Sequence, residues 1–273
     1  MDDPTPVGPD KSKPKPNQNF RRGPRTKAWA CRLFATNGSY PSMLRAVSDS
    51  ANDLNADSRR LDMLTVVITL VALGMYTQHA WAYRTLFLGN AVDDAYISFR
   101  YLENLATGQG LVYNPGERVE GYSNLLWILL LLPFRLAGAD VVRTSQLLGI
   151  GLGMATIVLA VVAVRRLFAV QSPVGITLAA FLPATSGYFA AWSIGGLEGN
   201  LYAFLMLAAW FFYHDVLAGK RRFPWAALCL ALLAMTRPEG LFIALAGAGY
   251  HVLRNHGSGT SIRDPKVWRF LLV

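Results

Sequence analysis

The stretch from residue 63 to residue 83, MLTVVITLVALGMYTQHAWAY, contains 21 residues and no formally charged side chain. A helix of this length crosses the hydrocarbon core of a bilayer, which is about 30 Å thick. The whole chain has 273 residues, of which 53% are hydrophobic and only 16% are charged. This composition is typical of an all-α membrane protein, and we expect a polytopic bundle of transmembrane helices.

Six further apolar runs follow this stretch. The two longest, 144–164 and 167–197, are long enough to span a bilayer, and the other four need flanking polar residues that reach the interface. Pro183 and Gly187 predict an irregular helix within the second of these long runs. The sequence therefore predicts about seven apolar segments over 61–273, the shorter ones being 121–134, 199–213, 223–236 and 240–253.

The N-terminal residues 1–60 differ from the rest in composition. They are rich in proline and lysine, which predicts a disordered tail, and they lack the pattern of a secretory signal peptide. They contain eleven Lys and Arg residues and six Asp, a net charge of +5, whereas the loop 84–122 has a net charge of −2. The positive-inside rule predicts a cytoplasmic tail, a loop on the outer face and a multi-pass protein of the cytoplasmic (inner) membrane. No folded basic face indicates nucleic acid as a partner.

The charge pattern leaves one topological conflict. The basic loop 217–224, LAGKRRFP, should be cytoplasmic, which puts Glu198 on the outer side together with the loop 84–122. Three apolar runs separate that loop from Glu198, and an even number is needed. Either one run is re-entrant or consists of two half-helices, with 167–197 as the first suspect, or Arg165 and Arg166 break the charge rule.

The sequence GIGLG at 149–153 has small residues at the first and fifth positions. This spacing lets two helices approach closely in a membrane. We interpret it as a packing feature.

The first outer loop contains a predicted helix. With Asp93 as its N-cap, an amphipathic helix runs to the stop signal near Gly108. Ile97, Tyr101 and Leu105 form an apolar stripe on this helix that suits the membrane surface.

The sequence NPGE at 114–117 is typical of a turn. We expect this turn to bring Glu117, Arg118 and Glu120 back toward the paired aspartates, just before the next apolar run begins.

Two interpretations of the paired aspartates stay open. They can simply cap the helix and favour its positive end. Three further ionisable residues lie between apolar runs, namely Glu198, Arg237 and Glu239. Ionisable groups near a membrane are costly and tend to face a polar cavity or each other, so together these residues predict a site.

Such a site suits one chemistry in particular. A carboxylate that faces a lipid-accessible cavity could act as a general base or hold a divalent ion, and arginines could neutralise a phosphate. A lipid phosphate and a hydroxyl acceptor together describe glycosyl transfer from a lipid-linked sugar. The chain has no GxSxG, P-loop, HExxH or dinucleotide motif. Its four histidines and two cysteines show no metal-ligand spacing, so we predict no built-in metal site.

Three motifs in order carry a resemblance to a known family. They are DDAYISFRYLENLATGQGLVYNPGERVEGYSNLLW from residue 93, GLEGNLYAFLMLAAW from residue 196 and LLAMTRPEGLFIALA from residue 232. Over about residues 62–254 the chain resembles bacterial integral-membrane glycosyltransferases of the GT-C class. It is most similar to the family of the mycobacterial terminal arabinofuranosyltransferase, which uses decaprenyl-phosphate arabinose.

The resemblance implies a polyprenyl-phosphate-sugar donor, a cell-envelope glycan or lipid as acceptor, and transfer at the outer face of the membrane. It implies no required cofactor, although paired carboxylates could hold a divalent cation. By the same analogy Asp93 and Asp94 are catalytic, with Asp93 the first choice for the base. The resemblance also implies sugar or acceptor contacts by Glu120 and Tyr122, phosphate contacts by Arg100, Arg118 and Arg237, and lining roles for Glu198 and Glu239.

The chain also departs from the family pattern. Gly199 stands where the motif after GLE commonly has threonine. Residues 266–273 (KVWRFLLV) resemble the start of an eighth helix, so we expect a truncated product that is inactive alone. The alternatives are a transporter or flippase of lipid-linked sugars, which would favour charges at the membrane midplane, and a non-catalytic fragment or membrane partner protein.

Overall fold

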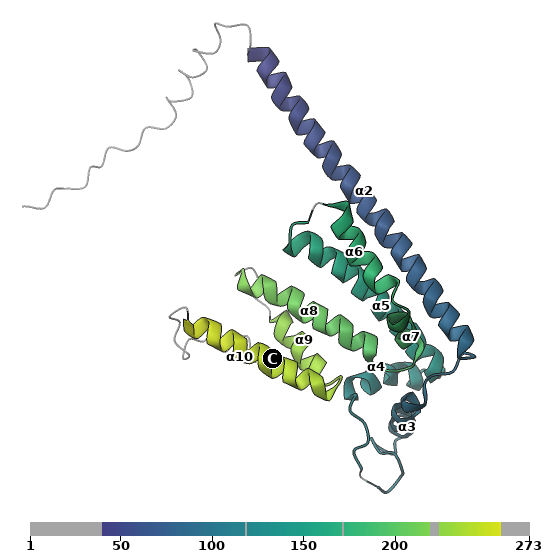
Figure 1. The fold of residues 1–273 in the computed structure, drawn as a ribbon. Helices are drawn as coiled ribbons and strands as arrows, with labels where there is room; N and C mark the ends of the chain where they lie inside the picture. The colour runs from purple at the N-terminus through teal and green to yellow at the C-terminus, as the bar shows by residue number, and fades with distance from the viewer. Residues whose placement is uncertain (1–39, 118, 171, 219–223, 258–273) are drawn as a thin grey trace, which may run out of the picture. The chain divides into compact units, whose positions relative to one another are not determined.

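The computed structural model describes residues 40–117, 119–170, 172–218 and 224–257. Within these ranges every regular element is a helix and none is a strand, which confirms the all-α prediction (Figure 1). The chain divides into two compact units, Met1–Arg59 and Arg60–Val273. The predicted eighth segment lies outside the described residues.

The described helices follow the apolar runs. Each of the seven runs contains a helix, and the run 167–197 contains two. In chain order the helices are α2 (Tyr40–Leu86), α3 (Asp93–Ala106), α4 (Leu125–Leu136), α5 (Val141–Leu167), α6 (Pro173–Ala184), α7 (Gly187–Ile194), α8 (Gly199–Leu217), α9 (Trp225–Ala234) and α10 (Pro238–Gly257).

Helix α2 begins earlier than the sequence predicts. We expected disorder over residues 1–60, but the structure is helical from Tyr40, and residues 1–39 lie outside the described ranges. Between Pro41 and Gly74 the chain has no helix-breaking residue. Because each added residue extends an existing helix by one hydrogen bond, the long apolar part of α2 supports helical extension toward the N-terminus.

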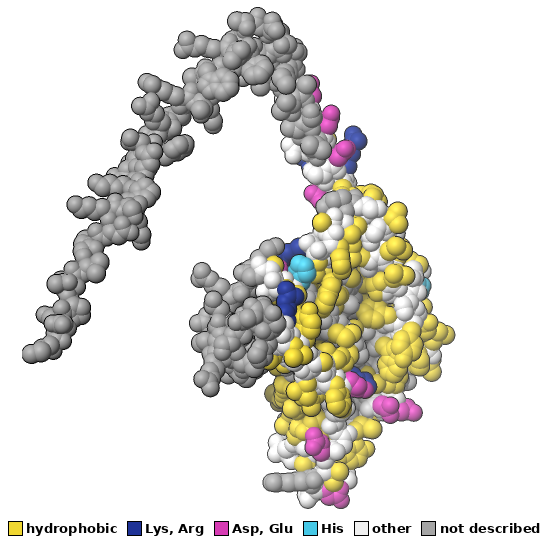
Figure 2. Space-filling model, turned by 60° about the vertical axis from the view of Figure 1, so that its left-hand side comes forward, with side chains coloured by type: hydrophobic (Ala, Val, Ile, Leu, Met, Phe, Trp, Pro, Cys, Tyr) yellow, Lys and Arg dark blue, Asp and Glu magenta, His cyan; other side chains and the backbone are white. Residues whose placement is uncertain are grey.

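The apolar surface is consistent with a membrane protein. Asn55–Leu86 and Val141–Leu167 are long and apolar enough to cross a membrane, and the bent pair α6 and α7 would make a third span. Val66, Val67 and Leu70 on α2 are each more than half exposed. Hydrophobic side chains cover much of the visible face (Figure 2). Apolar exposure of this kind marks a surface that faces lipid or a partner.

The expected irregularity in 167–197 is confirmed. The chain bends by 48° between α6 and α7. Pro183 lies in the last turn of α6, and Ser186 begins α7 by accepting a hydrogen bond of 3.2 Å from the Phe189 amide. The Ser186 side chain therefore caps the N-terminus of α7 directly after the break.

Helix α5 packs closely against α6, α7 and α8. A β-carbon on Gly149 would overlap the backbone oxygen of Ser193, and one on Gly153 would overlap the hydroxyl of Tyr76. The two small residues therefore allow the close helix approach that their spacing predicts.

Candidate functional site

Helix α3 places the paired aspartates at its N-terminus. It runs from Asp93 to Ala106, which confirms the predicted helix, but its N-cap is Val92. The expectation that Asp93 caps the helix is wrong, because neither aspartate side chain makes a capping hydrogen bond. Both carboxylates lie in the first turn and are exposed, where the helix dipole favours negative charge.

The buried face of α3 differs from the predicted apolar stripe. Ala95, Ser98, Phe99 and Leu102 are buried at helical spacing. Tyr101, which we expected at the membrane surface, is fully buried. The difference arises because α3 packs on α4 and on the returning loop and so buries a neighbouring face.

Tyr101 ties the loop back onto α3. Its hydroxyl donates to the Val119 oxygen and accepts from the Gly121 amide, each at 2.8 Å. The predicted turn is present, since the Glu117 amide donates to the Asn114 oxygen at 3.1 Å. The loop thus returns to α3, and its contacts at Val119 and Gly121 are with Tyr101 and not with the paired aspartates.

The turn before α8 packs directly on the start of α3. The Val92 amide donates to the Gly195 oxygen at 3.0 Å. Gly196 has φ +85°, and a β-carbon there would come within 2.8 Å of the Ala91 Cβ and 3.0 Å of the Ala95 Cβ. A glycine is therefore needed at this position both for its conformation and for its lack of a side chain.

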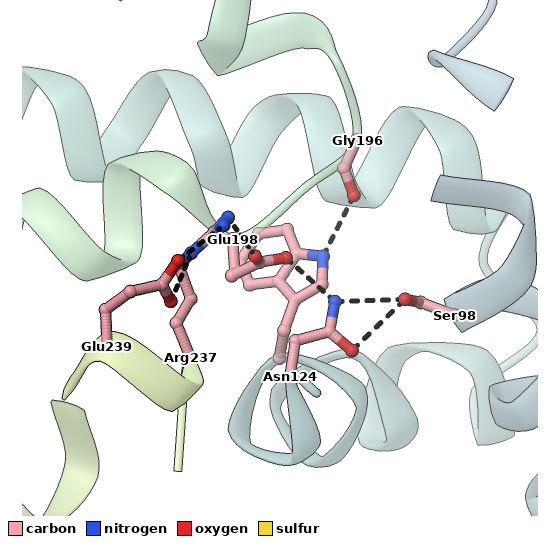
Figure 3. Close-up of polar contacts among 7 residues, drawn as sticks. Ser98, Asn124, Gly196, Glu198, Arg237 and Glu239 are labelled. Carbon is pink, nitrogen blue, oxygen red and sulfur yellow. Dashed lines mark hydrogen bonds and ion pairs between the residues drawn. The ribbon is translucent and has the colours of Figure 1, made fainter. Parts of the chain in front are cut away.

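A polar network joins four distant segments at this place (Figure 3). The Asn124 amide nitrogen donates to Ser98 Oγ at 2.9 Å and to Glu198 Oε2 at 2.8 Å. Arg237 Nη1 donates to Glu198 Oε1 at 2.9 Å, and Arg237 Nε donates to Glu239 Oε2 at 3.3 Å. The Glu198 side chain is only 4% exposed. The network fixes the geometry of α3, α4, α8 and the start of α10.

Arg237 keeps donors for a ligand. Its contact with Glu239 raises the pKa of the guanidinium, and the Glu239 backbone N–H together with Arg237 lowers the pKa of the Glu239 carboxyl. Three of the five guanidinium N–H groups are used by Glu198 and Glu239. Two remain, on a side chain that is 41% exposed. These two could bind an anionic oxygen.

Asp94 and Arg237 line one open cavity of about 640 Å³. The aspartate makes no hydrogen bond or ion pair with the described residues, so its carboxylate is free to act on a ligand. Asp93 is not among the lining residues. The other lining residues are largely aromatic or small, namely Ser186, Tyr188, Phe189, Trp192, Leu197, Gly199, Asn200, Tyr202 and Ala203.

The other predicted site residues are placed elsewhere. Glu120 and Tyr122 line a separate cavity of about 480 Å³, where burial and then the charge of Glu120 raise the pKa of Tyr122. Arg100 Nε donates to the Tyr113 oxygen at 3.2 Å and so holds the loop. Arg118 lies outside the described residues. The structure thus does not bring Glu120 to the cavity that Asp94 lines.

Gly199 lines the Asp94 cavity and has nothing within 4 Å of an added β-carbon. The cavity next to Gly199 is therefore open space.

Sequence reasoning assigned no role to several important residues. Asn124 and Ser98 complete the polar network, and the Trp127 ring nitrogen donates to the Gly196 oxygen at 2.9 Å. One signal was available, because Asn124 is an amide directly before a strongly apolar run. Nothing in the sequence indicates its partner.

Among the described residues, no group of three or more His, Cys, Asp and Glu side chains is arranged to hold a metal ion. Comparisons of the chain with protein-family models, curated proteins and solved structures found no match. Any assignment of function therefore rests on the residues of the cavity.

Proposed function

We propose that the chain is an integral-membrane glycosyltransferase of the GT-C class. It moves a sugar, arabinofuranose by the resemblance, from a polyprenyl-phosphate donor to a cell-envelope glycan or lipid. The observation that carries this proposal is that Asp94 and Arg237, from distant segments, line one cavity with an aromatic wall. A free carboxylate and a partly free guanidinium are the two groups that the transfer needs.

The proposed reaction assigns one step to each residue. Asp94 accepts the proton of an acceptor hydroxyl, whose oxygen then bonds to the anomeric carbon of the donor. The bond between that carbon and the phosphate oxygen breaks, and the electron pair leaves with the phosphate. The two remaining N–H groups of Arg237 stabilise the charge that develops on the phosphate. This single displacement inverts the configuration and needs no organic cofactor.

A multi-pass topology is part of the proposal. It is supported by contacts between α2 and α5 at two levels, one at each end of the apolar part of α2. At one level, Arg84 Nε donates to Gln146 Oε1 at 3.0 Å. At the other, Arg165 Nη2 lies 2.7 Å from Asp62 Oδ1. The helical residues from Asp62 to Arg84 rise about 33 Å, which matches the thickness of a bilayer core. These contacts support an arrangement in which α2 and α5 lie side by side across the bilayer.

Two further contacts support a topology with an even number of crossings between the first outer loop and Glu198. Asn124, just before α4, contacts Glu198, and Gln146, near the start of α5, donates to the Ile194 oxygen at 3.2 Å. These contacts support an arrangement in which both ends of the α4 segment lie at the level of the site and α4 does not cross the membrane. Two crossings then separate the first outer loop from Glu198. In this arrangement the N-terminal tail and Arg165 are cytoplasmic, and the site faces outward.

The experiment compares two neighbouring aspartates in the protein as the cell produces it, to its natural stop codon. Membranes that contain the wild type, Asp94→Asn or Asp93→Asn are given a panel of labelled polyprenyl-phosphate sugars, and transfer to acceptor is measured. We expect Asp94→Asn to lose at least about 100-fold in rate, because a general base contributes this much. Asp93→Asn is the matched control and should retain most activity. Loss of transfer in Asp93→Asn with retention in Asp94→Asn would move the base to Asp93.

A transporter or flippase of lipid-linked sugars is the second candidate. The observation in its favour is the 48° break between α6 and α7 next to the cavity that Ser186 lines, because transporters often use broken helices at their binding sites. If no donor is consumed but a lipid-linked sugar becomes accessible across proteoliposomes, this second function is correct.

A further inference from the structure

Asn200, on α8, is hydrogen-bonded to two other helices, α2 and α5, at the edge of the Asp94 cavity. The residue is 2% exposed and lines the cavity. Its amide nitrogen donates to the Gly149 oxygen and to the Tyr76 hydroxyl, each at 3.0 Å. A backbone oxygen can only accept a hydrogen bond, so the nitrogen of the Asn200 amide must be the atom that faces Gly149. The orientation of the amide is thus determined.

This orientation leaves the carbonyl oxygen of Asn200 as an uncommitted acceptor. Both N–H groups of the amide are used, and Oδ1 accepts no hydrogen bond from the described residues. Among the described residues, His214 Nδ1 is the one buried side-chain polar atom that lacks a partner, so Oδ1 of Asn200 is accessible from the cavity that the residue lines. A ligand in the cavity that offers an O–H donor would satisfy it.

The same cavity has an aromatic pair on α7. The rings of Tyr188 and Trp192 meet edge to face, with centroids 5.6 Å apart, and both line the cavity. They lie four residues apart and so share one face of the helix. Flat apolar rings accept the C–H face of another ring, which has no hydroxyl groups to desolvate.

We infer that Trp192, Tyr188 and the Asn200 carbonyl oxygen form a subsite for a sugar ring. The two aromatic rings cover the C–H face of the sugar, and Oδ1 of Asn200 accepts a hydrogen bond from one ring hydroxyl. This inference rests on the proposed function, since it assigns the sugar of the donor to a particular wall of the cavity. It makes Asn200 a specificity-determining residue, because a site built to bond a hydroxyl discriminates against a ring that lacks it.

The test measures binding and does not depend on transfer. The full chain in lipid nanodiscs is titrated with methyl arabinofuranoside, methyl mannopyranoside and the monodeoxy analogues of each, and saturation-transfer NMR gives the dissociation constants. For the wild type we expect one monodeoxy analogue of the preferred sugar to bind roughly tenfold more weakly. Tetrahydropyran, a ring without hydroxyls, should not bind measurably.

Two variants and one control test the proposed contacts of Trp192 and Asn200 with the sugar. Trp192→Leu should weaken binding of every glycoside, whereas Trp210→Leu, which changes a tryptophan that lines a different cavity, should not. Asn200→Ala should remove the discrimination against the one deoxy analogue. Because the Asn200 side chain also bonds to neighbouring helices, the unfolding midpoint of the Asn200→Ala variant is measured in parallel. If the variant does not fold, the wild-type series with the deoxy analogues decides alone.

The outcomes separate this inference from the proposed function. Equal binding of all monodeoxy analogues by the wild type, or binding of tetrahydropyran as tight as that of the glycosides, would overturn the subsite even if sugar transfer is observed. Hydroxyl-dependent binding that needs Trp192 supports it even if no donor is consumed. If neither binding nor transfer is detected, both proposals fail.

Discussion

The guanidinium of Arg237 lies 2.9 Å from the carboxylate of Glu198, and the two side chains are unequally buried. Glu198 is 4% exposed and Arg237 is 41% exposed. The carboxylate therefore depends on the arginine and on Asn124 for its polar contacts, whereas the arginine also reaches solvent and Glu239. The pair joins the start of α8 to the start of α10 at one wall of the cavity.

Because Glu198 is buried and Arg237 is partly exposed, we expect removal of the arginine to destabilise the protein more than neutralisation of the glutamate. Arg237→Met leaves a buried carboxylate without its cation and should cost about 3–5 kcal/mol. Glu198→Gln keeps an acceptor for Asn124 and should cost only about 1–2 kcal/mol. The double variant should be more stable than Arg237→Met alone. Thermal unfolding in detergent measures all three, and an Arg237→Met midpoint equal to that of the wild type would contradict the prediction.

The close packing of α5 predicts a contrast between neighbouring glycines. Gly149→Ala would force a β-carbon against the backbone of Ser193, and overpacking of this kind costs about 1–3 kcal/mol. Gly151 has open space around it, so Gly151→Ala should be neutral or should stabilise the helix by up to about 1 kcal/mol. The two unfolding midpoints are compared directly. Equal midpoints would mean that α5 and α7 lie further apart than the structure shows.

The turn before α8 predicts a second contrast. Gly196→Ala places a β-carbon against Ala91 and Ala95 and strains a backbone with φ +85°, so it should displace the start of α3. We expect a loss of stability of roughly 2 kcal/mol or more and a large loss of transfer. Gly199→Ala is the control for stability, because its β-carbon meets nothing within 4 Å. Transfer assays and unfolding curves on both variants check this, and full activity of Gly196→Ala would contradict it.

The pair Glu103 and Arg135 predicts a pH effect. Two hydrogen bonds of 2.6 and 2.7 Å from Arg135 lower the pKa of Glu103 below its ordinary value of 4.5. A lowered pKa stabilises the folded state above the unfolded pKa, and this contribution is lost as the pH falls through the folded value. Because both side chains are about one-third exposed, the effect should be small, less than about 3 °C in unfolding midpoint.

The control for this pH effect is Glu103→Gln, which should unfold at a lower temperature than the wild type at pH 7 and at nearly the same temperature at pH 3. A constant difference between the two proteins over this range would show that the Glu103 charge does not contribute to stability.

The cavity also predicts how transfer responds to metal removal. Among the described residues that line it, Asp94 is the sole carboxylate, and a divalent ion in a protein binds through several oxygen ligands. We expect transfer to persist after EDTA treatment, with less than a roughly twofold change. A loss of transfer that Mg²⁺ or Mn²⁺ restores would show that a metal takes part in the reaction.

Much of the helical architecture could be predicted from the sequence. Each of the seven apolar runs contains a helix, α3 has nearly the predicted limits, and Pro183 and Gly187 mark the break between α6 and α7. These features depend on local rules, namely hydrogen bonds between residues four apart and the effects of proline and glycine on the backbone. The extension of α2 back to Tyr40 was not predicted, because the composition of residues 40–60 does not by itself indicate a helix. Cooperative growth from the adjoining apolar helix can make such a segment helical.

The sequence could predict which residues belong to the candidate site, but it could not predict which of them share a cavity. The sequence identified Asp94, Glu198, Arg237 and Glu239, and the resemblance made Asp93 the first choice for the base. In the structure Asp94, and not Asp93, lines the cavity with Arg237. The placement of Glu120 in a second cavity depends on how the returning loop binds Tyr101.

The sequence by itself thus determined which segments are helical and which ionisable residues interrupt the apolar runs. Only the tertiary structure decided that Asp94 shares a cavity with Arg237, that Glu198 is buried against Asn124, and that Asn200 presents a free carbonyl oxygen. The physical reason is that helix formation is encoded by neighbours along the chain, whereas a site is made by side chains from separate helices. Their distances depend on how closely those helices pack, as at Gly149 and Gly196.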